Sequence, residues 1–205
     1  MSFEAWIAFA SATLVLLVIP GPTILLVVSY ALGQGWRAAL PLAIGVALGD
    51  FTAMTLSLFG VGALLKASAT LFTALKLLGA AYLVYLGFKL FRAGGTLNAK
   101  PRTDAAPALK MTLHAWIVTA LNPKGIAFFV AFVPQFVDRS QSFFGQAVIF
   151  EATFVILAAV NVLSYAFAAS RARALVNNAT VIKTINRAGG TLLIGAGVAT
   201  ATLHS

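Results

Sequence analysis

Apolar residues gather in six long stretches of the chain, separated by short segments in which polar residues, glycine and proline are frequent. Each stretch is near the roughly 20 residues that a helix needs to cross a bilayer. The six lie at about 4–29, 39–63, 69–90, 112–136, 144–168 and 186–203. The pattern predicts an all-α integral membrane protein with six transmembrane helices, or with five if the last stretch only lies at the membrane surface.

The composition argues against a separate soluble domain. Of the 205 residues, 60% are hydrophobic and only 9% are charged, whereas an ordinary soluble domain has about 25% charged residues. The longest polar segment, residues 92–110, has the composition of a flexible linker and is too short to form a core. We therefore expect one transmembrane domain over residues 1–205, with a linker at about 91–111. The N-terminal "MSFEAW" lacks the basic segment of a cleavable signal sequence, so the first stretch is expected to be retained.

The basic residues are distributed unevenly along this plan. With six spans the loops alternate between two sides of the membrane, and ten of the fourteen basic residues fall on one side. These ten are Arg37, Lys89, Arg92, Lys100, Arg102, Lys110, Arg171, Arg173, Lys183 and Arg187. The positive-inside rule places this side, including the linker at 91–111, in the cytoplasm and both termini on the opposite side. Attraction to anionic lipid headgroups accounts for the net charge of +9, so no nucleic-acid partner is expected.

The first and fourth stretches each contain helix-breaking residues near the middle. Proline lacks a backbone N–H and clashes with the preceding turn, and glycine loosens a helix, so both segments are expected to be interrupted. Irregular backbone at this depth is tolerated only where protein or a water-filled cavity satisfies it, and in secondary transporters it binds substrate. A purely structural kink is the alternative. The candidate substrate-binding residues at the two breaks are Pro20, Gly21, Pro22, Asn122, Pro123 and Lys124.

Each break is followed by a carboxylate at the same interval. Asp50 comes 28 residues after Pro22, and Glu151 comes 28 residues after Pro123. The spacing predicts two three-helix repeats, and because each has an odd number of spans, the second enters the membrane from the opposite face. The architecture expected is therefore that of an inverted-repeat secondary transporter. The repeats cover about 4–90 and 112–203.

The two carboxylates are the candidates to carry a coupling proton. A carboxylate inside a span costs about 2.5–3.5 kcal/mol on insertion scales, so it normally faces a partner or a cavity. Asp50 lies about a dozen residues into its stretch, and Glu151 about eight residues into its own. The alternative, which applies more to Glu151, is a charge near the interface that only anchors its helix.

Several other positions have structural or binding interpretations. Lys124 is expected to pair with a buried carboxylate or to contact a substrate carboxylate, unless its ammonium reaches the interface along the apolar stem. Asn122 is expected to cap the second half of its broken helix, which is compatible with binding. Asn161 is expected to form a hydrogen bond between helices. Gly45 and Gly49 form a small-xxx-small pattern that allows close helix packing.

The sequence shows no pattern typical of an enzyme. The chain has no cysteine, which excludes disulfides, thiol redox chemistry and thiolate metal sites. No set of His, Asp and Glu has the spacing of metal ligands, and no nucleophile–base pair or phosphate-binding glycine loop is apparent. We therefore expect no enzymatic activity, no cofactor and no resident metal.

Two segments resemble the signatures of the LysE/RhtB amino-acid exporters. The first is "IPGPTILLVVSYALGQGWRAALPLAIGVALGD", with its PGP and its Gly–Asp pair, and the second is "LNPKGIAFFVAFVPQF", with its NPK and PQF. "LKLLGAAYLVYLGFKLFR" resembles the family's third span, so the resemblance covers nearly the whole chain. It implies a bacterial inner-membrane exporter of amino acids, such as threonine, homoserine or leucine, driven by the proton motive force. It also implies periplasmic termini and is compatible with a homodimer.

Two alternatives stay open at this point. One is the export of a divalent metal ion by a related six-span plan, against which the absence of cysteine and of clustered intramembrane histidine argues. The other is a non-transporting membrane scaffold, which would not need two intramembrane carboxylates at matched positions. The favoured hypothesis is the export of a neutral amino acid by proton antiport.

Overall fold

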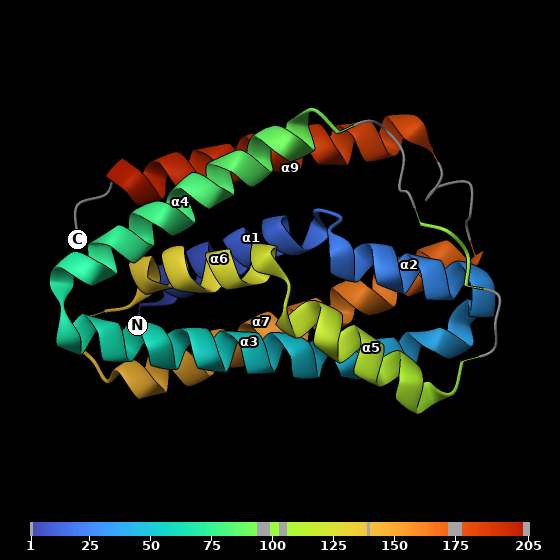
Figure 1. Ribbon diagram of the computed structural model, residues 1–205, viewed down its shortest axis with the longest axis horizontal. Helices are drawn as coiled ribbons and strands as arrows, with labels where there is room; N and C mark the ends of the chain where they lie inside the picture. The colour runs from blue at the N-terminus through green and yellow to red at the C-terminus, as the bar shows by residue number, and fades with distance from the viewer. Residues whose placement is uncertain (1, 94–98, 103–105, 139, 172–177, 203–205) are drawn as a thin grey trace.

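All regular structure in the described part of the chain is helical, as the hydrophobic pattern predicts. The computed structural model describes residues 2–93, 99–102, 106–138, 140–171 and 178–202 (Figure 1). The helices are α1 (Phe3–Val18), α2 (Pro22–Gln34), η1 (Gly35–Ala38), α3 (Ala39–Ala67), α4 (Ala69–Phe91), α5 (Ala108–Ala120), α6 (Pro123–Ala131), η2 (Val133–Phe136), α7 (Phe143–Arg171) and α9 (Ala179–Thr202). Arg173 and part of the linker, residues 94–98 and 103–105, lie outside the described residues.

Three helical segments are long and apolar enough to cross a membrane, namely 22–60, 73–91 and 143–171. The bent pair of α5 with α6 and η2 makes a fourth if it is one span. By these criteria the number is smaller than the six expected from the sequence. The helix α1 is apolar but has only 16 residues, and α2 follows it across the first break. The helix α9 begins seven residues before the expected start at 186 and includes Lys183 and Arg187 in its first half.

The helices run between two ends of an elongated molecule (Figure 1). The end of α2, the start of α5, the end of α7 and the start of α9 lie toward the right-hand end, whereas α4 ends nearer the middle of the view. The start of α1, the junction of α3 with α4 and the start of α7 lie at the left-hand end. The segments that carry most basic residues are therefore at the same end of the molecule.

Glycine allows α3 and α5 to approach closely, as the Gly45 and Gly49 pattern predicts. A Cβ atom added at Gly49 would lie 2.6 Å from the Cβ of Thr119 and 2.8 Å from the carbonyl oxygen of Trp116. A Cβ added at Gly45 would lie 2.7 Å from the Cβ of Ala115. Real Cβ atoms do not make such contacts, so the two helices can hold this separation only with glycine at both positions. This contact places Asp50, the residue after Gly49, beside the second break.

A cluster of phenylalanine rings fixes α6 against α1 and α7. The ring centroids of Phe9 and Phe150 are 4.7 Å apart, and those of Phe129 and Phe154 are 4.8 Å apart. These rings are almost fully buried, and burial of each such side chain contributes about 1.5–3 kcal/mol. On the outside, by contrast, large apolar side chains such as Leu56, Phe59 and Leu78 are exposed. A surface of this kind is suited to lipid rather than water.

Candidate functional site

The two breaks predicted from the sequence are present and lie against each other. The helix α1 ends at Val18 and α2 begins at Pro22, while α5 ends at Ala120 and α6 begins at Pro123. The side chain of Thr23 connects them: its hydroxyl is hydrogen-bonded to that of Thr119 at 3.2 Å. Residues 96 positions apart in sequence thus join the two interrupted helices at one place.

The prolines begin the second half of each interrupted helix as well as ending the first. Pro22 and Pro123 occupy the first helical position of α2 and α6, where a missing N–H costs no hydrogen bond. Asn122 caps α6 as predicted, since its Oδ1 accepts a hydrogen bond of 3.1 Å from the backbone N–H of Lys124. The Nδ2 of Asn122 donates to the hydroxyl of Thr23 at 3.1 Å, so the amide caps one helix and holds the other.

The first break leaves backbone carbonyls without helical donors, and side chains from the second half of the chain donate hydrogen bonds to them. The carbonyls of Leu16 and Val18 would accept from residues 20 and 22 in a continuous helix, but both of these are proline and have no N–H. The Nζ of Lys124 donates to the carbonyl oxygens of Leu16 at 3.0 Å and of Ile19 at 2.8 Å. The ammonium therefore lies on the partial negative charge at the end of α1.

Two side chains of α7 donate hydrogen bonds to the remaining carbonyls at the end of α1. The Nδ2 of Asn161 donates to the carbonyl oxygen of Leu17 at 3.1 Å, and the hydroxyl of Tyr165 donates to that of Val18 at 2.7 Å. Asn161 thus forms the interhelical hydrogen bond expected of it. Asn161 and Tyr165 are four residues apart and share one face of α7. Each of the four freed carbonyls has a side-chain donor, which explains how irregular backbone is tolerated within an apolar segment.

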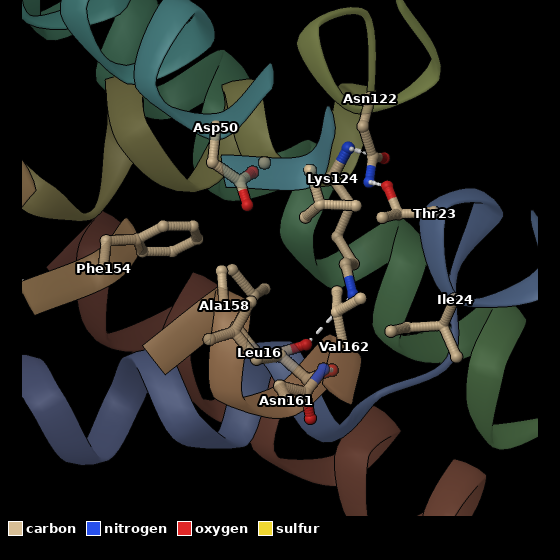
Figure 2. A pocket seen from close by; sticks show the side chains of 13 residues that line it. Leu16, Thr23, Ile24, Asp50, Asn122, Lys124, Phe154, Ala158, Asn161 and Val162 are labelled. Carbon is tan, nitrogen blue, oxygen red and sulfur yellow. Dashed lines mark hydrogen bonds between the residues drawn. The ribbon is translucent and has the colours of Figure 1, made fainter. Parts of the chain in front are cut away.

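A small cavity lies between these carbonyls and Asp50 (Figure 2). Its volume is about 30 Å³, which is room for one or two water molecules and not for an amino acid. Asp50 on α3 and the stem of Lys124 on α6 lie on different sides of it, as Figure 2 shows. Phe154, Ala158 and Val162 of α7 form its apolar floor. The site is closed in this conformation.

The side chains of Asp50 and Lys124 both line the cavity, but no bond joins them among the described residues. Asp50 is 7% exposed, and the wall around it is largely apolar. Lys124 does not form the ion pair that was one expectation for it, because its ammonium bonds to backbone carbonyls instead. Its side chain also does not reach outward along the bilayer, the other structural expectation.

Glu151 does not lie in the cavity. Its carboxylate accepts a hydrogen bond from the hydroxyl of Thr55 on α3. It nevertheless occupies the same face of α7 as Phe154 and Ala158, one turn nearer the start of the helix. The matched spacing of the two carboxylates is therefore not a matched position at the site.

A second cavity, with a volume of about 190 Å³, lies between α1, α4, α6 and α9. All of its lining residues are apolar, including Leu83, Phe128, Phe132 and Leu193. Leu16 borders both cavities. The second cavity has no polar side chain that could bind a charged group. Polar side chains that could do so line the first cavity.

Sequence reasoning missed three residues of the site, Thr23, Thr119 and Tyr165. Tyr165 could have been noticed, because it stands one helical turn after Asn161 in an otherwise apolar stretch. The threonines carry no such signal, since threonine is common in membrane helices and often bonds only to its own backbone.

The fold and site together define an all-helical membrane protein with interrupted helices around a buried polar site, and sequence comparison gives the family. Residues 14–203 match the profile of the LysE type translocators. The chain therefore belongs to the LysE type translocator family, which is a family of transporters. No solved structure matches the chain.

Relatives over the whole or part of the chain carry names of membrane or efflux proteins. A homoserine/homoserine lactone efflux protein of Salmonella typhimurium is 30% identical over 203 residues, which cover 98% of each chain. A leucine efflux protein of Salmonella choleraesuis is 37% identical over 134 residues, covering 65% of this chain and 63% of that protein. A membrane protein of Vibrio cholerae is 29% identical over 202 residues, or 98% of each chain.

Proposed function

We propose that this protein exports neutral amino acids from the cytoplasm by proton antiport. The observation that carries the proposal is the group of freed carbonyls at the end of α1, occupied by a primary ammonium and separated by a small cavity from a buried carboxyl. An amino acid has the same primary ammonium, and secondary transporters bind substrates at interrupted helices. A structural kink alone would not need a lysine and an aspartate at this depth.

The ends of the interrupted helices provide a place for each charged group of a zwitterion. The carbonyls of the residues before Pro20 form a negative pole suited to the ammonium. The start of α2, where Gly21 and Pro22 lie, has no side-chain capping bond, and its amides form a positive pole suited to the carboxylate. Asn122 adds an amide, and Pro123 and Lys124 begin the helix that faces this pole.

Asp50 is the carboxyl we assign to the coupling proton. It is buried, it borders the cavity, and it has no bonded partner among the described residues that would hold it in one charge state. Glu151 is proposed as a second proton site outside the cavity, on the α7 face that continues toward it. A proton taken up from the outer side and released inside would then be exchanged for the outgoing amino acid.

We further propose that the chain crosses a bacterial inner membrane six times as two inverted repeats. The repeats are α1 to α4 and α5 to α9: each begins with an interrupted helix and continues with a helix of 29 residues, α3 or α7. The gathering of the basic segments at one end of Figure 1 supports a cytoplasmic location for the linker 91–111 and periplasmic termini. A homodimer is compatible with this arrangement.

The names of the relatives support a neutral substrate. Homoserine and leucine are the amino acids in the names of the two efflux proteins. Neither carries a charged side chain, and the cavity already has one lysine and one aspartate in its wall. A side chain with a further charge would have no partner there.

A toxicity screen tests the proposal. Cells that overproduce the protein are grown with dipeptides or analogues that deliver toxic amounts of single amino acids, among them leucine, homoserine, lysine and aspartate. We expect protection against the neutral ones, with an Asp50→Asn variant at equal abundance giving none. Protection against divalent metal salts instead would favour a metal-ion exporter, and protection against nothing would favour a non-transporting scaffold; either result would contradict amino-acid export.

A further inference from the structure

We propose that Lys124 is a built-in substitute for the substrate's α-ammonium: in the closed site its Nζ holds the carbonyls of Leu16 and Ile19, and the incoming substrate displaces it toward Asp50. This inference rests on the proposed function and adds a mechanism for coupling. It assigns the substrate's ammonium to a defined pair of atoms.

The first step concerns which donor at the break can move. Three side chains satisfy the freed carbonyls, from Lys124, Asn161 and Tyr165. Asn161 and Tyr165 are short or rigid side chains on the long helix α7. Lysine has a compact ammonium on a flexible four-carbon stem. Of the three, Lys124 is the donor that can leave its acceptors without moving a helix.

The second step concerns the chemistry of the exchange. The α-ammonium of an amino acid and the Nζ of lysine are both primary ammonium groups with three N–H donors. An exchange of one for the other keeps a charged donor on Leu16 and Ile19, so no buried carbonyl is left without a partner. A hydroxyl or a secondary amide in the same place would lose the charge that suits the end of a helix.

The third step concerns the space over the break. A Cβ atom added at Gly21 would lie 3.5 Å from both the Cε and the Nζ of Lys124. The lysine stem thus passes directly over the glycine at the start of α2. A substrate whose ammonium replaces this Nζ would have its carboxylate next to the uncapped amides of α2.

The fourth step concerns where the displaced ammonium goes. Asp50 is buried, it borders the same cavity, and the surrounding wall is largely apolar, so its carboxyl holds a proton before the substrate binds. An ammonium that loses its carbonyl partners in such a place needs a new partner, and the carboxylate of Asp50 can provide it. When Lys124 reaches Asp50, the carboxyl gives up its proton to the cytoplasmic side, and an ion pair forms as the substrate binds.

The reverse sequence completes the antiport on the outer side. A proton from the periplasm neutralises Asp50, the ion pair is lost, and the Nζ of Lys124 returns to the carbonyls of Leu16 and Ile19. The lysine then expels the substrate's ammonium. One proton enters for each amino acid that leaves.

Binding to the purified full-length protein in lipid nanodiscs tests this exchange. L-leucine and L-homoserine are titrated by calorimetry in two weak buffers with different ionisation enthalpies, so that affinity and proton release are both measured. With the wild-type protein we expect a proton to be released on binding. With Lys124→Met we expect binding about tenfold tighter, because no charge-assisted hydrogen bonds to the lysine have to be broken first, and no proton release. Lys110→Met, which removes an exposed lysine at the start of α5, serves as the control and should change neither quantity.

Weaker or unchanged binding by a folded Lys124→Met protein would overturn the exchange, because it would make the lysine a direct substrate contact or a structural group. Ligand analogues test the wild-type protein if that variant does not fold. Leucinol, which keeps the ammonium, should bind and release a proton. The hydroxy acid 2-hydroxy-4-methylpentanoate, which lacks the ammonium, should neither bind nor cause proton release. Equal binding of the hydroxy acid would overturn the exchange. A wild-type protein that exports amino acids but fails these tests contradicts only this inference, whereas one that exports none contradicts the proposed function itself.

Discussion

The ammonium nitrogen of Lys124 lies 2.8 Å from the carbonyl oxygen of Ile19, the residue that caps the end of α1. A charge carried by the second half of the chain thus stabilises a backbone break in the first half. Pro20 and Pro22 remove the helical donors of the Leu16 and Val18 carbonyls, and Lys124 also bonds to the carbonyl of Leu16. The predictions below follow from this arrangement and from the helix contacts that support it.

Restoring the missing donors should make the protein a poorer transporter without unfolding it. In a Pro20→Ala/Pro22→Ala double variant the new N–H groups can bond the carbonyls of Leu16 and Val18, and the first helix can continue. We expect an export rate lower by about tenfold or more, the effect of at least ~1.4 kcal/mol on the transport barrier. The thermal unfolding temperature should be unchanged or higher. Pro107→Ala, before the start of α5, is the matched control and should transport normally.

Removing one donor from α7 should destabilise the break. Tyr165→Phe deletes the hydroxyl bonded to the carbonyl of Val18, a partly exposed residue of an apolar helix, and a carbonyl left without a partner in apolar surroundings costs about 1–3 kcal/mol. Thermal unfolding in detergent should show a lower midpoint for this variant. Ser164→Ala removes a neighbouring exposed hydroxyl that bonds only within its own helix, and it should leave the midpoint unchanged. Equal midpoints for both variants would show that the tyrosine bond contributes nothing.

Alanine substitution at two glycines of α3 should change the stability of the protein in opposite directions. Gly49→Ala forces a Cβ into Thr119 and Trp116, and such overpacking costs about 1–3 kcal/mol. An alanine at Gly60 meets no atom within 4 Å and should stabilise the helix by about 0.5–1 kcal/mol. The denaturation midpoint should be lower than that of the wild type for Gly49→Ala and higher for Gly60→Ala. A Gly49→Ala protein as stable as wild type would contradict the close contact of α3 with α5.

The two carboxylates should differ in their importance for coupling. Glu151→Gln keeps an oxygen that can accept from Thr55, and the side chain lies outside the cavity. We therefore expect this variant to retain part of its proton-driven export, whereas Asp50→Asn loses it. Initial rates in vesicles under an imposed pH gradient make the comparison. Complete loss with Glu151→Gln and full activity with Asp50→Asn would reverse our assignment of the two residues.

The sequence predicted those parts of the site that depend on residue type and spacing. Proline and glycine within apolar stretches predict the two breaks, Asn122 before Pro123 predicts the cap, and Gly45 with Gly49 predicts close packing of α3 against another helix. Each of these follows from local sterics or from a single hydrogen bond. Such effects are specified within a few residues.

The rest depends on atoms that no residue letter specifies. The acceptors of Lys124 are backbone carbonyls, which every residue has, so the sequence could suggest a charged partner but not the actual one. The matched spacing of the two carboxylates also did not specify that only Asp50 borders the cavity. At the second break the N–H groups of Leu121 and Asn122 donate to the carbonyls of Ile117 and Thr119 within the same segment.

Proton-driven accumulation in everted membrane vesicles tests the central claim most directly. Vesicles with an acidic lumen are supplied with labelled leucine or homoserine, and uptake into the lumen is measured for the wild-type protein and for Asp50→Asn at equal abundance. We predict accumulation that depends on the pH gradient with the wild-type protein, and none with Asp50→Asn. Equal accumulation by both proteins, or accumulation that does not respond to collapse of the gradient, would contradict proton antiport through Asp50.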